Sequence, residues 1–199
     1  EILEDIMGKG LIPADPVTWT SRRRAIVPAF HKRWLQRMIS MFALKVDVLN
    51  DDLKTTSGPV DLEERFGSLA LDIIGSAVFN YEFDSTLKPS KVVQAAIDTL
   101  REAEHRSMTP APYWKIPGAM QLVPRQRAFT ANMNLLNDQL NNAIAGAFED
   151  RVEMDTEDLQ ENMDYDTMEN PSLLRFLVDQ RGEEATGTQL RDDLMTMLI

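Results

Sequence analysis

The spacing of apolar residues predicts helices along most of the chain, because apolar side chains recur every three or four positions. The clearest stripe predicts a long helix over about residues 125–152 and consists of Phe129, Met133, Leu136, Leu140, Ile144 and Phe148. A second stripe predicts a helix over about 33–54 and consists of Leu35, Met38, Phe42, Val46, Leu49 and Leu53. The sequence shows no convincing period-two alternation of the kind that strands produce. It therefore predicts a mainly α fold.

Capping residues mark where other helices are expected to begin. Asp15 and Pro16 predict a helix from Pro16 to Val27, because aspartate is a favourable N-cap and proline fits the first helical position. Asp61 and Glu64 match a capping box for a helix whose inner face is Leu62, Phe66, Leu69, Ile73 and Ala77. Three shorter helices are expected: one marked by Val93, Ile97 and Leu100, one after Pro171, and one capped by Thr188 and bearing Leu190, Leu194 and Met197.

Two connections lack this periodicity. Residues 105–124 carry Pro110, Pro112, Pro117 and Pro124, which exclude a continuous helix. Residues 149–169 hold ten acidic side chains against one arginine, a composition typical of a solvated, mobile connection. The chain opens within the helix-like EILEDIM and stops at apolar residues, so we expect a fragment of a longer protein.

Charge is unevenly distributed along the 199 residues. The formal net charge is -11, yet residues 16–46 contain no Asp or Glu and hold seven Lys and Arg. Residues 47–199, by contrast, carry 13 basic against 28 acidic side chains, so a basic segment precedes an acidic remainder. The consecutive arginines Arg22, Arg23 and Arg24 belong to this basic segment. Cysteine is absent, which excludes disulfides, thiolate metal ligands and cysteine nucleophiles within these residues.

The helix that carries the three arginines offers a surface for an anion. Trp19 and Arg23 are four residues apart and share one helix face, with Ile26 near the same stripe. The indole N–H and the guanidinium are donors only, and together they suit a planar carboxylate at the edge of an apolar pocket. Two alternatives stay open. In the first, Trp19 would be a core residue and the arginines would be solvated or paired with acids elsewhere. In the second, the basic run would bind phosphate or nucleic acid, although it lacks interleaved aromatics and a known motif.

Other motifs do not meet their requirements. Gly8-Lys9-Gly10 lacks the third glycine and the preceding strand of a dinucleotide-binding fingerprint. His31 and His105 are too far apart in sequence to suggest a local metal pair, and no metal site is predicted.

The arginine segment resembles a known family. Trp19-x-x-x-Arg23-Arg24 followed by Pro28-Ala29-Phe30-His31 is similar to the C-helix region of cytochromes P-450, in which this Trp and Arg bind a haem propionate. GKGLIPAD (8–15), FGSLALDIIGSAVFNYEF (66–83) and LRDDLMTMLI (190–199) follow the family's order, the last two resembling its E helix and the start of its I helix. EAEHRS (102–107) and PYWKIPGAMQLVPRQRAF (112–129) look most like the plant and algal plastid enzymes that hydroxylate carotenoid rings.

This resemblance implies a partial cytochrome P-450 fold, from the C-helix region to the start of the I helix, with residues 1–199 forming part of one domain truncated at both ends. The parent would bind haem b through a cysteine thiolate and insert one oxygen atom of O2 into a C–H bond of an apolar substrate, with a carotenoid ring as the candidate. That cysteine would lie beyond Ile199, so the chain is expected to be inactive by itself. It would hold no catalytic residue and no metal ligand, and its cofactor-binding residues would be Trp19 and Arg23.

The resemblance also implies partners. The parent would take electrons from a ferredoxin or a flavoprotein reductase and would not bind nucleic acid. Arg22 and Arg24, together with Lys32, Arg33 and Arg37, are expected to contribute to a positive surface that meets this acidic donor.

Residues 105–124 fall where the family connects its F and G helices. There they would line the substrate channel, through Met108, Tyr113, Trp114 and Ile116, or touch a membrane. The alternative is that their apolar side chains simply cap the core. The parent is expected to be membrane-associated, in plastids if the likeness to the carotenoid hydroxylases holds and otherwise in the endoplasmic reticulum.

Two rival interpretations differ in kind. One is a non-enzymatic all-α interaction module with a basic docking face, which would show no dependence on haem. The other is a degenerate gene product that keeps the family's sequence without its chemistry.

Overall fold

The computed structural model describes residues 2–30, 32–149, 151, 172–181 and 186–199. Its helices are α1 (Ile2–Met7), α2 (Pro16–Ile26), α3 (Lys32–Thr55), α4 (Leu62–Ile74), α5 (Lys91–Met108), α6 (Ala119–Leu122), α7 (Pro124–Glu149), α9 (Leu173–Arg181) and α10 (Gly187–Leu198). Two 3-10 turns, η1 (Val27–Phe30) and η3 (Tyr113–Lys115), and a π-helical turn, η2 (Gly75–Phe79), accompany them. Strands are absent from the described ranges, which confirms the predicted mainly α fold.

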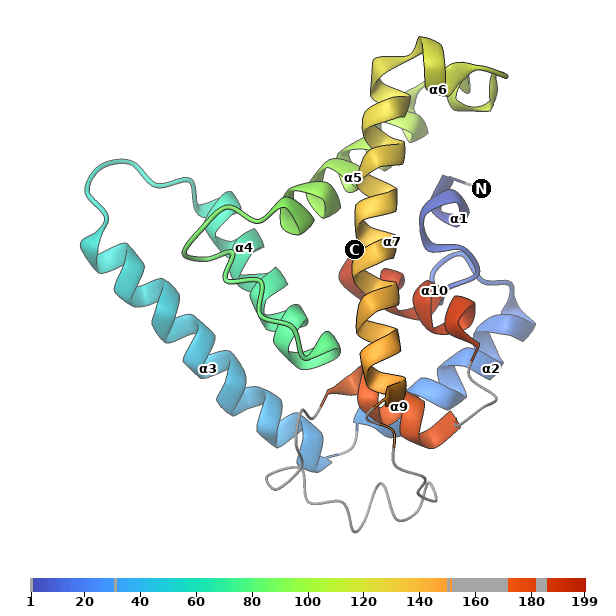
Figure 1. Ribbon diagram of the computed structural model, residues 1–199. Helices are drawn as coiled ribbons and strands as arrows, with labels where there is room; N and C mark the ends of the chain where they lie inside the picture. The colour runs from blue at the N-terminus through green and yellow to red at the C-terminus, as the bar shows by residue number, and fades with distance from the viewer. Residues whose placement is uncertain (1, 31, 150, 152–171, 182–185) are drawn as a thin grey trace.

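The long helix α7 runs through the middle of the molecule, with α5, α6, α9 and α10 packed against it (Figure 1). Its buried face consists of the predicted residues Phe129, Met133, Leu136, Leu140 and Ile144. Phe148, the sixth member of that stripe, is partly buried against the same core. The helix ends at Glu149 rather than at the predicted residue 152.

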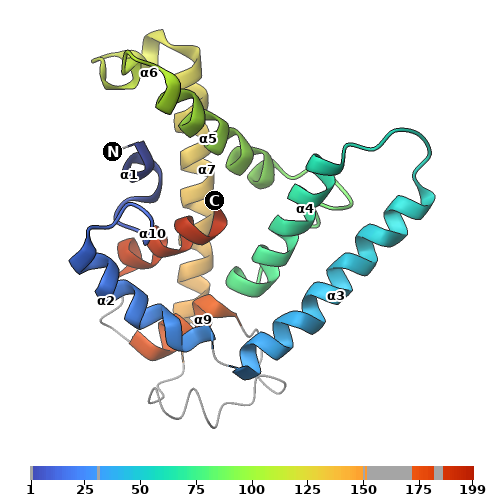
Figure 2. The same cartoon turned by 180° about the vertical axis from the view of Figure 1, so that it is seen from behind.

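Two groups of helices lie on opposite sides of α7 (Figure 2). On one side are α1 and α2, the other side holds the pair of α3 and α4, and α10 crosses α7 between the two groups. The predicted inner faces of α3 and α4 are only partly correct, since Leu49 and Leu69 are buried whereas Leu35, Leu62 and Phe66 are exposed. These two helices pack chiefly on each other, so only part of the apolar stripe on each helix is buried by a neighbouring helix.

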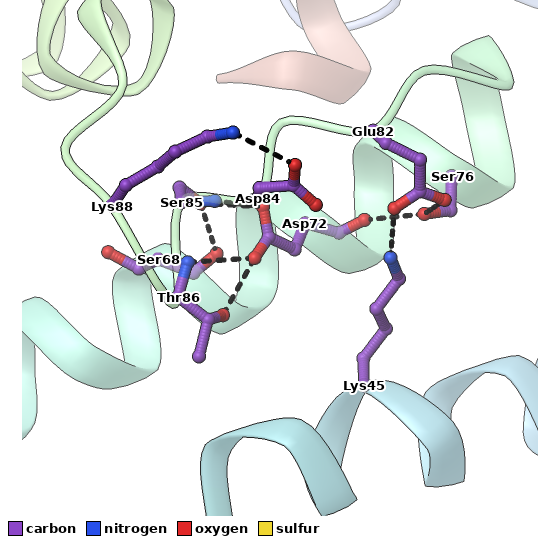
Figure 3. A network of polar contacts seen from close by, with 9 residues as sticks. All are labelled: Lys45, Ser68, Asp72, Ser76, Glu82, Asp84, Ser85, Thr86 and Lys88. Carbon is purple, nitrogen blue, oxygen red and sulfur yellow. Dashed lines mark hydrogen bonds and ion pairs between the residues drawn. The ribbon is translucent and has the colours of Figure 1, made fainter. Parts of the chain in front are cut away.

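A buried carboxylate fixes the chain where it turns back after α4 (Figure 3). Asp72 accepts hydrogen bonds from the backbone N–H and hydroxyl of Ser85, at 2.8 and 2.7 Å, and from the same two groups of Thr86, also at 2.8 and 2.7 Å. Burial raises the pKa of Asp72, but these four donors outweigh it and hold the pKa below its ordinary value. Nothing in the local sequence pattern indicated this interaction.

A second contact in the same region joins α3 to the turn. Glu82 accepts a hydrogen bond from the Ser76 hydroxyl at 2.8 Å and forms an ion pair with Lys45 of α3 (Figure 3). Gly75 is the first residue of the π-helical turn. A larger residue would not fit there, because a Cβ would lie 2.6 Å from the Tyr81 carbonyl oxygen and 2.5 Å from the Phe83 ring. The predicted α-helical face therefore does not continue to Ala77, which lies in the π turn.

Three predicted boundaries need correction. Thr186, not Thr188, caps α10, and its hydroxyl accepts from the Gln189 N–H at 3.3 Å. Helix α5 extends through Met108, so the proline-containing connection begins at residue 109, and Pro124 begins α7. Apart from Glu149 and Arg151, the acidic connection at 149–169 lies outside the described residues, and its assignment stays a prediction.

Candidate functional site

The start of α2 is fixed by its own sequence. Asp15 accepts from the backbone N–H groups of Val17 and Thr18 at 3.0 and 3.1 Å and from the Thr18 hydroxyl at 2.6 Å, and Pro16 is the first helical residue. The Thr18 hydroxyl is the main cause that lowers the pKa of Asp15, so the cap stays ionised at neutral pH. This confirms the predicted helix start, and the helix ends at Ile26, one residue before the predicted Val27.

Trp19 and Arg23 lie side by side on one face of α2, as predicted. The Arg23 guanidinium carbon is 5.4 Å from the centroid of the Trp19 ring, a distance typical of a cation–π contact. Both line an open groove of about 880 Å³. Its lining is Leu11, Ile12, Ala14, Trp19, Arg23, Ile26, Val27, Phe30, Thr196 and Met197.

The polar groups of this groove are few and are mainly donors. Trp19 is 41% exposed, and Arg23 is exposed as well. Among the described residues, no carboxylate pairs with the Arg23 guanidinium. An apolar surface edged by an unpaired guanidinium and an indole N–H is suited to a flat apolar ligand that carries a carboxylate.

Arg22 turns away from the groove, which corrects its predicted place on a positive surface. Its Nη1 donates to Asp193 of α10 at 2.7 Å and to the Gln189 carbonyl at 3.4 Å, and both side chains of the ion pair are buried. A lone buried guanidinium would lose its hydration, and the Asp193 carboxylate compensates for that loss. Arg24, by contrast, is exposed.

The remaining predicted members of the positive surface are only partly described. Lys32 is exposed, and Arg37 is half-buried with an interaction partner of its own. The side chain of Arg33 lies outside the described residues. The donor-docking surface therefore rests on Arg24 and Lys32 among the described side chains and stays a prediction.

The Gly8-Lys9-Gly10 segment wraps around Asp192, the neighbour of Asp193 on α10. The Lys9 N–H donates to the Asp192 carboxylate at 2.8 Å. A Cβ at Gly8, whose φ is +56°, would lie 2.4 Å from that carboxylate, and a Cβ at Gly10 would lie 2.1 Å from the Thr196 hydroxyl. The two glycines therefore serve close packing of the α1–α2 connection on α10.

The predicted channel residues lie in different environments. Trp114 lines a second open groove, also of about 880 Å³, between α1, α5 and the following connection, whereas Tyr113 is not in its lining. The Trp114 indole nitrogen is buried without a hydrogen-bond partner in the described part of the chain. Met108 and Ile116 are 77% and 59% exposed and do not line this groove.

A buried charge cluster stands beside the second groove, and the sequence pattern did not reveal it. Glu102 accepts from Arg106 at 2.9 Å, from the Tyr113 hydroxyl at 2.5 Å and from Arg125 of α7. Burial raises the pKa of Glu102, but the hydrogen bonds from Tyr113 and the two arginines outweigh it and lower the pKa. Burial, and then the Glu102 carboxylate, raises the pKa of the Tyr113 phenol.

The Arg106 guanidinium is held from several sides. Its carbon lies 3.9 Å from the Phe129 ring centroid and 5.1 Å from that of Trp114, and its Nη2 donates to Gln126 at 2.8 Å. Such a fully partnered cation joins α5, η3 and α7 into one unit. In the described ranges, no group of three His, Cys, Asp or Glu side chains is placed to hold a metal ion.

The comparisons with known proteins identify the family. A sequence profile described as Cytochrome P450 matches residues 2–199. The chain belongs to the cytochrome P450 family. Within the P450 family it is 51% identical over 210 residues to cytochrome P450 97B2, chloroplastic, of Glycine max, a match that covers 100% of this chain and 36% of that protein.

Two relatives from Arabidopsis thaliana also match along the full chain. Identity is 45% to Protein LUTEIN DEFICIENT 5, chloroplastic, covering 33% of that protein, and 37% to carotene epsilon-monooxygenase, chloroplastic, covering 37% of it. The chain thus spans about a third of the length of these relatives. The resemblance that Trp19, Arg23 and their surroundings predicted is confirmed.

Proposed function

We propose that the chain is part of a haem-dependent monooxygenase that inserts one oxygen atom of O2 into a C–H bond of an apolar substrate. The observation that carries this proposal is the Trp19–Arg23 pair at the edge of an apolar groove, in a chain of the P450 family. Trp19 and Arg23 would hold a haem propionate by hydrogen bonding and charge.

The groove fits this cofactor on its own chemistry. Haem is a flat apolar ring with carboxylates on one edge, and the groove has an apolar lining with donors at Trp19 and Arg23. Burying a propionate costs several kcal/mol unless a cation pairs with it, and Arg23 is a guanidinium without a carboxylate partner among the described residues. When bound through a thiolate, haem would supply activation of O2 at its iron. This chain's residues would bind and orient the ring.

Haem content provides the test. In the complete polypeptide that the gene encodes, Arg23→Ala is expected to lower haem affinity by about tenfold or more, as loss of a charged hydrogen bond does. Arg24→Ala is the matched control, because Arg24 is the exposed neighbouring arginine and does not line the groove. Equal haem per polypeptide in the wild type and Arg23→Ala would contradict the assignment.

The substrate class is proposed from the relatives and the second groove. One relative is a carotene epsilon-monooxygenase by name, and carotenoid rings are apolar, as is much of the groove that Trp114 lines. Trp114→Ala is expected to weaken binding of a carotene measured by the haem absorbance shift, whereas Ile116→Ala, outside the groove lining, is expected to change it less. The opposite order would place the channel elsewhere.

A second role, contact with a membrane, is proposed for the connection at residues 109–123, between α5 and α7. Met108, Ile116, Met120 and Leu122 are all exposed, and they lie at the end of the molecule marked by α6 (Figure 1). No helix in the described ranges is both long and apolar enough to cross a bilayer. We expect vesicles to protect backbone amides of residues 109–123 from hydrogen exchange, and unchanged exchange would remove this role.

Location and electron supply are proposed from the relatives and from the basic residues of α2 and α3. The relatives named above are chloroplastic, so we propose a plastid location, with the endoplasmic reticulum as the alternative. A ferredoxin or a flavoprotein reductase would dock on the exposed basic residues Arg24 and Lys32 and from there supply electrons for the reaction. A rate of reduction that does not change with salt would count against this surface.

The rival from another class is a non-enzymatic interaction module with a basic docking face. It predicts that haem binds neither tightly nor in proportion to the polypeptide. A haem titration of the complete polypeptide separates the two, since a stoichiometric end point supports the monooxygenase and its absence supports the module or a degenerate gene product.

A further inference from the structure

Arg22 and Arg23 are consecutive residues on α2 with opposite surroundings. Arg22 is buried against α10, and Arg23 is exposed at the groove edge. Consecutive residues on an α-helix point about 100° apart around its axis. The direction of Arg23 is therefore set by whatever fixes the direction of Arg22.

The contact that holds Arg22 is directional. Its guanidinium donates to Asp193 at 2.7 Å and to the Gln189 carbonyl at 3.4 Å, so it spans one turn of α10. In the part of the chain that the structure describes, no other α2 side chain hydrogen-bonds to another helix. Ile26 is buried as well, but apolar packing tolerates rotation more readily than a hydrogen-bonded ion pair does.

The same helix that anchors Arg22 also forms part of the groove wall. Met197 lies one turn beyond Asp193 on α10, and Met197 and Thr196 both line the groove that Arg23 edges. The anchor and the wall thus belong to one rigid element. The Arg22–Asp193 pair sets how far the Arg23 face of α2 stands from that wall.

We propose that Arg22 and Asp193 are positioning residues for the Trp19–Arg23 site, a proposal that rests on the proposed haem function. The buried pair fixes the rotation of α2 against α10, so that the Arg23 guanidinium faces the groove before any ligand binds. Neither Arg22 nor Asp193 touches the ligand. Their contribution is preorganisation, which lowers the cost of ordering Arg23 on binding.

A double-mutant cycle tests this role in the complete haem-loaded polypeptide. The rate of haem loss to excess apomyoglobin is measured for the wild type, Arg22→Ala, Arg23→Ala and the double variant. If Arg22 acts through Arg23, Arg22→Ala speeds haem loss about tenfold when Arg23 is present and less than about twofold when Arg23 is replaced, a coupling of roughly 1–1.4 kcal/mol.

A merely structural role gives a different result. Arg22→Ala would then speed haem loss equally in both backgrounds, in line with its effect on unfolding by denaturant, and the proposal would be overturned. Arg175→Ala is the matched control, because Arg175 is a buried arginine paired with Asp179 at 2.9 Å and is not in the groove lining. It is expected to lower stability without any coupling to Arg23→Ala.

Two conservative variants keep the test valid if Arg22→Ala does not fold. Asp193→Asn retains a side-chain acceptor of nearly the same shape, and Arg22→Lys retains the charge but loses the planar guanidinium. Both are expected to accelerate haem loss by a few-fold, again only when Arg23 is present. If Arg23→Ala itself leaves haem loss unchanged, the proposed function fails; if Arg23→Ala accelerates it and neither variant does, only the positioning role fails.

Discussion

Arg106 donates its Nε to Glu102 at 2.9 Å, one turn earlier on α5, at a place where neither side chain reaches solvent. The same carboxylate also accepts from Tyr113 and Arg125, so it links α5 to η3 and to α7. A buried carboxylate with three donors loses part of its stabilisation when any one of them is removed.

We predict that Glu102→Gln destabilises the protein by roughly 2–4 kcal/mol, because it leaves the buried Arg106 guanidinium facing a neutral amide, whereas the partly exposed Arg125 can still be solvated. The measurement is unfolding by denaturant in the complete polypeptide. Glu104→Gln is the control, since Glu104 is an exposed acid on the same helix and its removal should change the free energy of unfolding little. Equal effects of the two substitutions would show that the cluster does not stabilise the fold.

Stability is expected to fall at acid pH partly because of Asp72 and Glu102. Both have folded-state pKa values below their ordinary values, so their stabilisation is fully present above the unfolded pKa of about 4 and is lost as pH falls through the folded pKa. Unfolding free energies measured between about pH 6 and pH 2 should therefore decrease less steeply in Glu102→Gln than in the wild type. An unchanged slope would mean that Glu102 does not bind its proton differently in the two states.

Periodicity predicted the helices well and their buried faces less well. The stripe from Phe129 to Ile144 was correct because α7 is surrounded by other helices, whereas Leu62 and Phe66 are exposed on α4, which packs mainly on α3 and on the adjoining π turn η2. A hydrophobic stripe predicts which face of a helix can be buried, but the tertiary arrangement determines how much of that face is buried.

The site was predictable where it depends on local spacing. Trp19 and Arg23 share a face because of the helical repeat, which needs no tertiary information. The burial of Arg22 depends on Asp193, which lies 171 positions later in the chain. The residues next to Arg22 or to Asp193 in the sequence do not indicate that the two pair. The same holds for Glu102 with Arg125 and for Asp72 with Ser85.

The cap of α10 gives a prediction with an internal control. Thr186 accepts from the Gln189 N–H, whereas Thr188 lies within the helix and is exposed. Thr186→Ala should therefore cost about 1 kcal/mol, and Thr188→Ala should be neutral or slightly stabilising because alanine is the better helix former. Thermal unfolding of the two variants compares them directly, and the reverse order would restore the cap that the sequence suggested.

Close packing of the α1–α2 connection on α10 leads to the last prediction. A Cβ at position 10 would lie 2.1 Å from the Thr196 hydroxyl and 2.5 Å from the Asp192 carbonyl oxygen, and the carbonyl belongs to a helical backbone that cannot turn aside. Gly10→Ala should therefore destabilise the protein by about 1–3 kcal/mol. Gly67→Ala is the matched control, since nothing lies within 4 Å of its added Cβ and helix α4 should gain up to about 1 kcal/mol.

Removing the Thr196 hydroxyl distinguishes the two sources of this strain. In Gly10→Ala combined with Thr196→Ala, the contact with the hydroxyl is gone but the contact with the Asp192 carbonyl remains, so the rescue should be partial. Complete rescue would assign the whole strain to one side chain. No destabilisation in Gly10→Ala would show that the connection can move away from α10 without cost, and that the Gly8-Lys9-Gly10 segment is not needed for the close approach.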